Sequence, residues 1–216
     1  MSEFLKRALT GIIYAALLIG SHLYSFSIYS ILLLFVLGYI LIFEWPQLVI
    51  GQPKYFWVVT IFYPVMPVLA LIFLNYSYRS YSLILPLYPY FASWVCDVNG
   101  LIIGKWIGKY KICPKISPGK SWEGLMAGFL GILILNIFLY NYLTILSGMS
   151  LLLLISFSLL LAVMDFFGDI FISYLKRKVG LKDTGKILPG HGGLLDRFDS
   201  VFFTVFVVLG VIYFRI

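Results

Sequence analysis

Apolar stretches recur along the whole sequence, and each is close in length to the thickness of a bilayer. A helix that crosses the hydrocarbon core needs about 20 apolar residues, with a range of about 17 to 25. The runs are continuous rather than alternating, which disfavours a β-barrel. We therefore expect an all-α, polytopic membrane protein with about seven transmembrane helices. The candidate spans, of which the first, fourth and seventh are short, are 8–24, 27–43, 55–74, 81–96, 123–146, 150–170 and 199–214.

Composition leads to the same class of protein. Of the 216 residues, 62% are hydrophobic and 12% are charged, whereas a soluble domain carries about 25% charged residues. This leaves too little polar surface to cover a soluble globule. Lys6 and Arg7 precede the first apolar run, but no small-residue cleavage site closes it, so we interpret it as a span and not as a signal peptide. Residues 1–216 are predicted to form a single membrane-embedded domain.

The basic residues lie almost entirely on one side of this topology. With the N-terminus inside, the inner segments hold 14 of the 16 lysine and arginine residues, and only Arg79 and Arg215 lie outside. The positive-inside rule therefore predicts a cytoplasmic N-terminus and a functional cytoplasmic face of the cell membrane. A simpler alternative is that these charges only set topology and attract anionic lipid. The inner segments are 1–7, 44–54, 97–122 and 171–198.

Acidic residues gather in the last inner segment and the helix before it. Five of the nine acids lie within residues 165–199. Asp165 and Asp169 are four residues apart and share one face of a helix, and Asp196 and Asp199 are three apart where the seventh helix begins. Carboxylates at membrane depth are costly and by default mark a functional site, although Asp is also a favoured N-cap. Four converging carboxylates suit Mg²⁺, which takes oxygen ligands. A second cation stays open.

Basic residues and glycines follow the acids closely. Phosphoryl and nucleotidyl transfer depend on positioning and on charge neutralisation. The run 189–193 permits close approach of backbone N–H groups to an anion, and His191 within it fits a structural role or a phosphate contact equally. The residues alone thus predict a metal-dependent site for phosphorylated substrates at the membrane surface. The bases beside the acids are Lys176, Arg177, Lys182 and Arg197.

A second motif precedes the fifth span. Gly119-Lys120-Ser121 matches the end of a phosphate-binding loop, but the full motif needs a glycine where Pro114 stands and a buried strand before it, so we reject that interpretation. A hydroxyl followed by Glu123 at the start of an apolar run is typical of a helix cap. A cap does not explain Lys120.

Residues 173–199 resemble the signature of the phosphatidate cytidylyltransferases (CDP-diacylglycerol synthases). That pattern is Ser-x-apolar-Lys-Arg, four residues, Lys-Asp-x-small, then Pro-x-His-Gly-Gly-apolar-x-Asp-Arg-apolar-Asp, and the sequence meets it at every position. Gly168-Asp169, the block from Ser117 to Gly124 and Glu44-Trp45 are also similar to this family. The resemblance covers most of residues 5–205.

The resemblance implies transfer of CMP from CTP to phosphatidate, with release of pyrophosphate. It implies that Asp169 and Asp196 hold the metal, with Asp199 and Asp165 as further ligands. Its partners are CTP, phosphatidate or a similar lipid phosphate, and membrane lipids; a homodimer stays open and no nucleic acid is expected. The catalytic set is Asp169, Asp196, Lys176 and Arg177, and the substrate-binding set is Ser117, Lys120, Ser173, Lys182, Asp183, His191, Gly192, Gly193 and Arg197.

Several departures keep other interpretations open. The chain is shorter than many family members, Val98-Asn99-Gly100 replaces an Ala-Tyr pair, and Ile172 stands where an acid is common. CDP-archaeol synthases are similar and also short, so an ether-linked isoprenoid phosphate is an alternative substrate. A lipid kinase such as a polyprenol kinase is a second enzyme alternative. A transporter fits less well, since it predicts midplane acids and internal repeats.

Overall fold

The computed structural model describes residues 3–49, 56–80, 82–190 and 192–215, and helices dominate these ranges. Two short strands form the only sheet among these residues, an antiparallel hairpin that pairs Lys111 with Ser121. In chain order the elements are α1 (Glu3–Tyr24), α2 (Phe26–Tyr39), η1 (Ile40–Glu44), α3 (Trp45–Val49), α4 (Phe56–Thr60), η2 (Ile61–Val65), α5 (Met66–Tyr78), η3 (Leu85–Leu87), α6 (Tyr88–Trp106), β1 (Lys111–Cys113), β2 (Ser117–Ser121), α7 (Trp122–Leu139), α8 (Leu151–Lys178), α9 (Leu195–Phe198) and α10 (Val201–Arg215).

The all-α, multi-pass membrane fold is confirmed. Among the described residues, five helical stretches are long and apolar enough to cross a bilayer, and the apolar part of α1, Leu9–Tyr24, is shorter. Each of the seven predicted spans corresponds to a helical segment, although α6 is not one of the five. The five are Phe26–Val49, Trp57–Tyr78, Trp122–Leu139, Leu151–Lys178 and Leu195–Phe214.

Several helix ends differ from the predicted boundaries. The inner segment predicted to begin at residue 97 is still helix, because α6 continues to Trp106. Glycines on this last part of α6 let it pack on α7, and that contact outweighs the polar residues that suggested a loop. α7 ends at Leu139 and turns follow, whereas α8 runs on to Lys178. Three basic residues in the last turn of α8 suit the negative end of its helix dipole.

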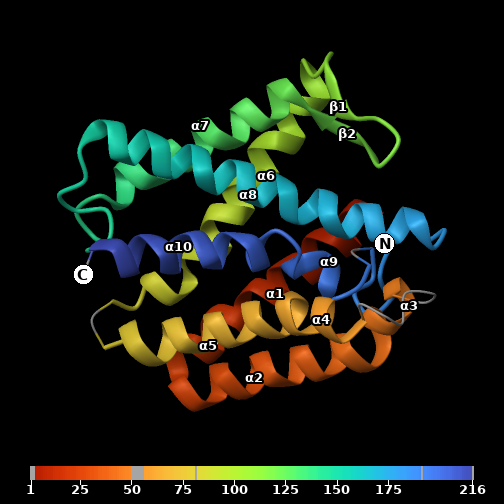
Figure 1. Cartoon of the computed structure of the whole chain (residues 1–216), viewed down its shortest axis with the longest axis horizontal. Coiled ribbons are helices and arrows are strands. Elements are labelled where there is room, and N and C mark those ends of the chain that lie inside the picture. The colour runs from red at the N-terminus through yellow and green to blue at the C-terminus, as the bar shows by residue number, and fades with distance from the viewer. Residues whose placement is uncertain (1–2, 50–55, 81, 191, 216) are drawn as a thin grey trace.

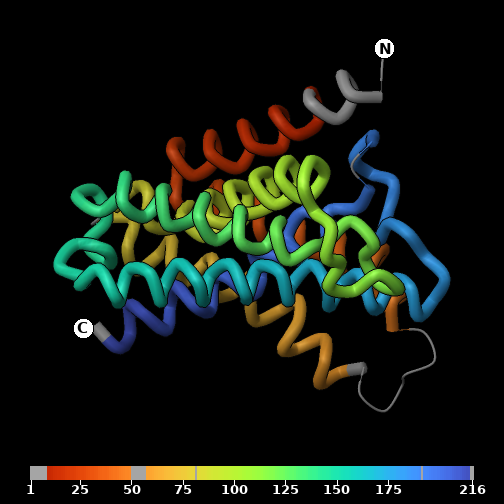
Figure 2. Tube along the Cα trace, turned by 90° about the horizontal axis from the view of Figure 1, so that it is seen from above, coloured from red at the N-terminus to blue at the C-terminus, as the bar shows by residue number. Residues whose placement is uncertain are grey.

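The polar segments collect at one end of the molecule. Most helices run along the long axis, with the two termini at opposite ends (Figure 1). The β1–β2 hairpin, α3, α9 and the connection from α8 to α9 lie at the N-terminal end, and the view turned by 90° agrees (Figure 2). The motifs found in the sequence therefore share one end of the helix bundle.

Glycines allow the helices around these motifs to approach closely. A Cβ atom built on Gly124 of α7 would lie 2.9 Å from the backbone oxygen of Gly100 on α6, and one on Gly128 would lie 2.6 Å from Cys96 Sγ. Small residues at such contacts are typical of helix packing in membranes. The apolar core, with Trp45 and Phe198 fully buried, fills the rest of the bundle.

Candidate active site

Both predicted pairs of acids line one cavity of about 370 Å³, which we call the acidic cavity. Its walls come from α6, β2, α7, α8, α9 and Asp199, which lies between α9 and α10. Five acidic and three basic side chains line it, so acids from two distant segments do converge. The charged wall residues are Asp97, Asp165, Asp169, Asp196, Asp199, Lys105, Lys120 and Arg197, and the predicted Ser117 also lies on the wall.

Gly168 explains why these acids meet. A Cβ atom at this position would lie 2.5 Å from the backbone oxygen of Asp199 and 2.8 Å from Ser200 Cα. The Ser200 hydroxyl also donates to the backbone oxygen of Asp165, at 3.0 Å. The face of α8 that carries Asp165 and Asp169 is therefore held directly against the start of the last helix.

The hairpin contributes a lysine to the same cavity. Lys120 Nζ lies 2.9 Å from Asp169 Oδ2 and 3.5 Å from Asp97 Oδ1, and the Ser173 hydroxyl donates to the other oxygen of Asp169 at 3.2 Å. Burial alone would lower the pKa of Lys120, but the charges of Asp169 and Asp97 outweigh it and hold that pKa above its ordinary value. Lys120 is thus a permanent cation beside Asp169.

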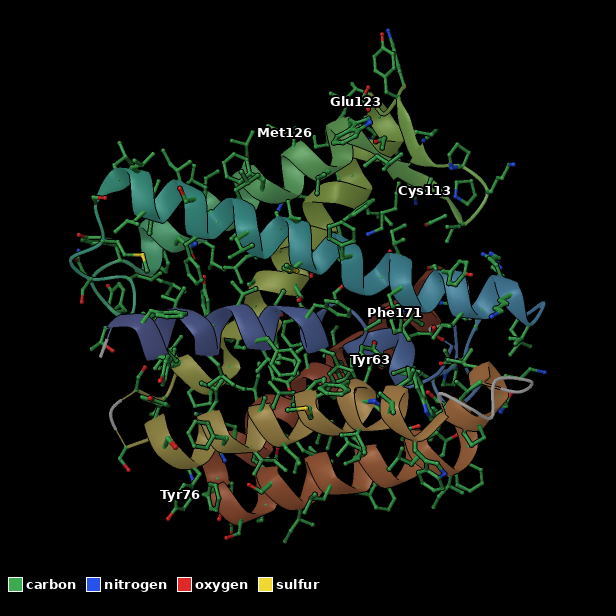
Figure 3. All side chains as sticks on the ribbon, in the orientation of Figure 1. Tyr63, Tyr76, Cys113, Glu123, Met126 and Phe171 are labelled. Carbon is green, nitrogen blue, oxygen red and sulfur yellow. The ribbon has the colours of Figure 1, made fainter. Side chains whose placement is uncertain are left out.

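The helix-cap interpretation of the second motif is confirmed. The Ser121 hydroxyl caps α7 by accepting from the backbone N–H of Gly124, at 3.2 Å. Glu123 accepts from the backbone N–H groups of Lys109 and Tyr110, at 3.1 and 3.2 Å, and lies at the hairpin end of the molecule (Figure 3). These bonds fix the hairpin that carries Lys120.

Asp196 holds together the connection between α8 and α9. Its Oδ1 accepts from Lys176 Nζ at 2.7 Å, and its Oδ2 accepts from the N–H groups of Thr184 and Gly193, at 2.8 and 3.0 Å. The Thr184 hydroxyl lies 3.0 Å from the same Oδ2. Most of these contacts fall on Oδ2, whereas Oδ1 accepts from Lys176 alone. Asp196 therefore holds the loop through one oxygen and the buried ammonium through the other.

Glu44 supports the same connection from the other side. This buried carboxylate closes the π-helical turn η1 and accepts from the N–H groups of Leu194 and Leu195, at 2.8 and 2.7 Å. The Thr184 hydroxyl lies between the two carboxylates, 3.1 Å from Glu44 and 3.0 Å from Asp196, and its one proton is shared between them. A Cβ atom at Gly193 would lie 2.2 Å from Thr184 Oγ1. Gly193 therefore leaves the space in which Thr184 and Glu44 approach the loop.

A second, larger cavity of about 1040 Å³, the basic cavity, adjoins the first. The two share Leu101, Lys105 and Arg197 as wall residues. Lys182, Asp183 and Gly192 of the predicted substrate-binding set lie on the wall of the basic cavity. Gly192 has a φ of +86°, and a Cβ atom there would lie 2.7 Å from Asp196 Oδ2. His191 lies outside the described residues.

Lys176 and Arg177, predicted to contact phosphate, line neither cavity. Lys176 is buried against Asp196. Arg177 donates to the backbone oxygens of Ile116 and Leu181, at 3.2 and 3.1 Å. Ser173 donates a hydrogen bond to Asp169, and the N–H of Gly193 donates one to Asp196. A direct phosphate contact of these residues stays a prediction.

Sequence reasoning assigned no site role to several residues that the structure brings in. They are Asp97, Lys105, Lys186, Glu44 and Thr184. For Glu44 and Asp97 a signal was present, since each is an isolated acid at the end of an apolar run. Thr184 and Lys186 carry no such signal.

The acids fit a magnesium ion that the substrate helps to coordinate. Among the described residues, no three His, Cys, Asp or Glu side chains form a metal site by themselves. Mg²⁺ usually takes one or two carboxylates and completes its shell with water and substrate phosphates. Asp165 Oδ1 is buried in this wall without a hydrogen-bond partner in the described part of the chain, so an acceptor stands ready for such a cation.

Comparison with known proteins settles the family. A sequence profile described as "Cytidylyltransferase family" matches residues 6–215. The chain belongs to the cytidylyltransferase family. Membership in this family confirms the predicted resemblance and the predicted nucleotidyltransferase class.

Proteins similar to this cytidylyltransferase include three named "Phosphatidate cytidylyltransferase". The one from Rickettsia typhi is 35% identical over 210 residues, which cover 95% of this chain and 90% of that protein. The one from Rickettsia prowazekii is 37% identical, over 89% of this chain and 88% of that protein. The one from Thermotoga maritima is 43% identical over 130 residues, 58% of this chain and 48% of that protein. The aligned part thus spans nearly the whole Rickettsia proteins and about half of the Thermotoga protein.

Proposed function

We propose that this protein is a phosphatidate cytidylyltransferase, which transfers CMP from CTP to phosphatidate and yields CDP-diacylglycerol and pyrophosphate. Family membership supports the reaction class, and the names of its relatives support the substrate. The observation that carries the proposal is the pair of adjoining cavities, one mainly acidic and one mainly basic, at one end of a membrane-spanning bundle. A water-soluble nucleotide and a membrane-bound phosphate can both reach such a place.

The residues proposed to hold Mg²⁺ are Asp169 and Asp196, with Asp165 and Asp199 beside them on the wall of the acidic cavity. The chemistry that Mg²⁺ supplies when bound is neutralisation of the charge on the phosphates. Asp165 and Asp169 reach the cavity from one helix face, and a cation at Asp169 would take the place of Lys120 Nζ, which lies 2.9 Å from Oδ2. At Asp196 the cation would bind beside the Lys176 ammonium, which lies 2.7 Å from Oδ1.

The main role of the protein in this reaction is to position the lipid phosphate against the α-phosphorus of CTP. An oxygen of the lipid phosphate forms a bond to the α-phosphorus of CTP, and the bond from that phosphorus to the bridging oxygen breaks, so the electron pair leaves with pyrophosphate. A phosphate monoester has a second pKa of about 6, so the nucleophile is already deprotonated and no general base is required. Lys105 and Arg197, which line both cavities, are proposed to bind the phosphates where they meet.

We further propose that this end of the bundle faces the cytoplasm. The inner segments of the predicted topology carry 14 of the 16 basic residues of the sequence, as the positive-inside rule expects, and the hairpin, α3 and α9 at this end belong to those segments. CTP is a cytosolic nucleotide, so this orientation gives it direct access to both cavities.

The test uses purified protein in detergent with CTP, Mg²⁺ and either phosphatidate or an archaetidic acid analogue. We expect pyrophosphate release that depends on phosphatidate, with CDP-diacylglycerol as the second product. Release with the ether-linked isoprenoid phosphate alone would identify an archaeol-type substrate instead. Formation of CDP in place of pyrophosphate would identify a kinase and contradict the proposal.

A further inference from the structure

An apolar groove between the first two helices borders the basic cavity. This α1–α2 groove has a volume of about 220 Å³ and shares Leu188 with the basic cavity. The Thr10 hydroxyl donates to the backbone oxygen of Pro189, at 3.2 Å, and holds α1 against the glycine-rich connection. Polar and apolar space therefore meet at Leu188. Side chains that line the groove include Ile13, Tyr14, Leu17, Leu32, Phe35 and Val36.

The groove is open to the lipid. Ile13, Leu17 and Phe35 on its walls are 56%, 60% and 71% exposed, on helices whose outer surface is apolar. From Thr10 to Leu18, α1 rises about 12 Å at 1.5 Å per residue. The groove thus reaches from the polar end of the bundle well into the hydrocarbon layer. An alkyl chain can enter it sideways from the bilayer.

Three lysines of the basic cavity are not paired with a carboxylate of the described residues, although Asp183 also lies on its wall. Lys105, Lys182 and Lys186 line it, and none of the three has a hydrogen bond or an ion pair to another described residue. Lys120 and Lys176, by contrast, are each held by a carboxylate. Because a dianionic phosphate needs cations that are not already neutralised, the three lysines of the basic cavity suit it better.

We propose that the basic cavity and the α1–α2 groove together form the site of the lipid phosphate. The phosphate lies among Lys105, Lys182 and Lys186, and an acyl chain lies in the groove between α1 and α2. The nucleotide then occupies the acidic cavity, and the two substrates meet at Lys105 and Arg197, which belong to both walls. This assignment rests on the proposed function, because it places the substrate of that reaction.

A second apolar cavity could also hold an acyl chain, and it is compared with the α1–α2 groove. It measures about 400 Å³ and lies between α4, η2, α8 and α10, with Val58, Phe62 and Phe206 on its walls. It shares no wall residue with either polar cavity. Tyr63 and Phe171, 5.1 Å apart between ring centroids, also line it and lie close together (Figure 3). An acyl chain placed there has no adjoining basic wall for its phosphate.

The first test fills each apolar space with an indole. Leu17→Trp is expected to raise KM for dioleoyl phosphatidate at least fivefold, and KM for dihexanoyl phosphatidate by less than twofold, since a short chain needs little of the groove. KM for CTP should not change. The matched control is Val58→Trp, which fills the second apolar cavity and should leave both lipid KM values unchanged. The opposite pattern, with only Val58→Trp raising the dioleoyl value, overturns the assignment.

The second test removes one cation from the basic cavity. Lys186→Met should raise KM for phosphatidate about tenfold, because one charge-assisted bond of about 1.5 kcal/mol is lost, with a much smaller change in KM for CTP. Lys178→Met, which removes a lysine on neither cavity wall, is the control and should change neither value. An equal or larger rise in KM for CTP would place the nucleotide in the basic cavity and overturn the proposal.

The proposed function and the placement of the lipid can be wrong separately. If the wild-type protein releases no pyrophosphate from CTP with phosphatidate, the proposed function is wrong. If the wild-type protein is active but Leu17→Trp and Lys186→Met leave KM for phosphatidate unchanged, only the placement of the lipid is wrong. Thermal unfolding of each variant in detergent shows whether a loss of activity comes from a loss of fold.

Discussion

Asp169 and Asp196 are both acids of the proposed metal site, yet their side chains are already engaged to different degrees. Asp169 accepts from Lys120 and Ser173. Asp196 accepts from the buried ammonium of Lys176 and from the N–H groups of Thr184 and Gly193. Removing the charge of each acid therefore separates a catalytic effect from a structural one.

We expect Asp169→Asn to lower kcat on the order of 100-fold or more, as for other groups that stabilise charge in the transition state, with little loss of stability. Asp196→Asn should also lose activity, but it strands Lys176 and should cost about 3–5 kcal/mol of stability. Turnover at saturating Mg²⁺ and thermal unfolding in detergent measure the two effects. Near-normal turnover of Asp169→Asn removes it from the proposed ligands, and an unchanged stability of Asp196→Asn contradicts the buried pair.

At the scale of elements, the acidic cavity depends on how closely α8 lies against the start of α10. Gly168 makes this contact, because any side chain there meets the backbone at Asp199 and Ser200. Gly210 lies on the same last helix, and nothing lies within 4 Å of a Cβ atom built there. A Gly→Ala change therefore creates a steric clash at Gly168 and none at Gly210, so the second serves as the control for the first.

Gly168→Ala is expected to push α8 and α10 apart, which moves Asp165 and Asp169 away from Asp199 and lowers kcat at least tenfold. Gly210→Ala should leave turnover unchanged and should stabilise the helix slightly, by up to about 1 kcal/mol. The measurements are CMP transfer and thermal unfolding for both variants. Equal activity of the two variants would show that the close contact at Gly168 is not what brings the acids together.

The sequence predicts contacts within one helix well, but it does not predict contacts between distant elements. The spacing of Asp165 and Asp169 within one helix predicts a shared face, because helix geometry is fixed. The bond from the Thr184 hydroxyl to Glu44 joins residues 140 positions apart, and only tertiary packing creates it. Lys176 and Arg177 follow the family signature, but helical phase turns them toward Asp196 and the backbone and away from the cavities.

For the whole molecule, the pattern of charges and apolar runs was enough to predict a polytopic helical bundle, because lipid permits few alternatives. The path of α6 was harder to predict. The sequence pattern predicts a polar loop at Asp97 and Lys105, yet both residues lie on a helix and line the acidic cavity. Polar side chains that face a cavity between helices look the same in a sequence as those that face water.

The orientation of the molecule leads to the last prediction. Cys113 lies on the hairpin, whereas Cys96 is buried, and the turn that holds Ser147 is exposed at the opposite end of the bundle (Figure 1). A membrane-impermeant maleimide should therefore label Cys113 in inverted vesicles but not in right-side-out vesicles. In a Cys113→Ser, Ser147→Cys variant the accessible side should reverse. Labelling of Cys113 from outside the cell would place both cavities away from cytosolic CTP and would contradict the proposed topology.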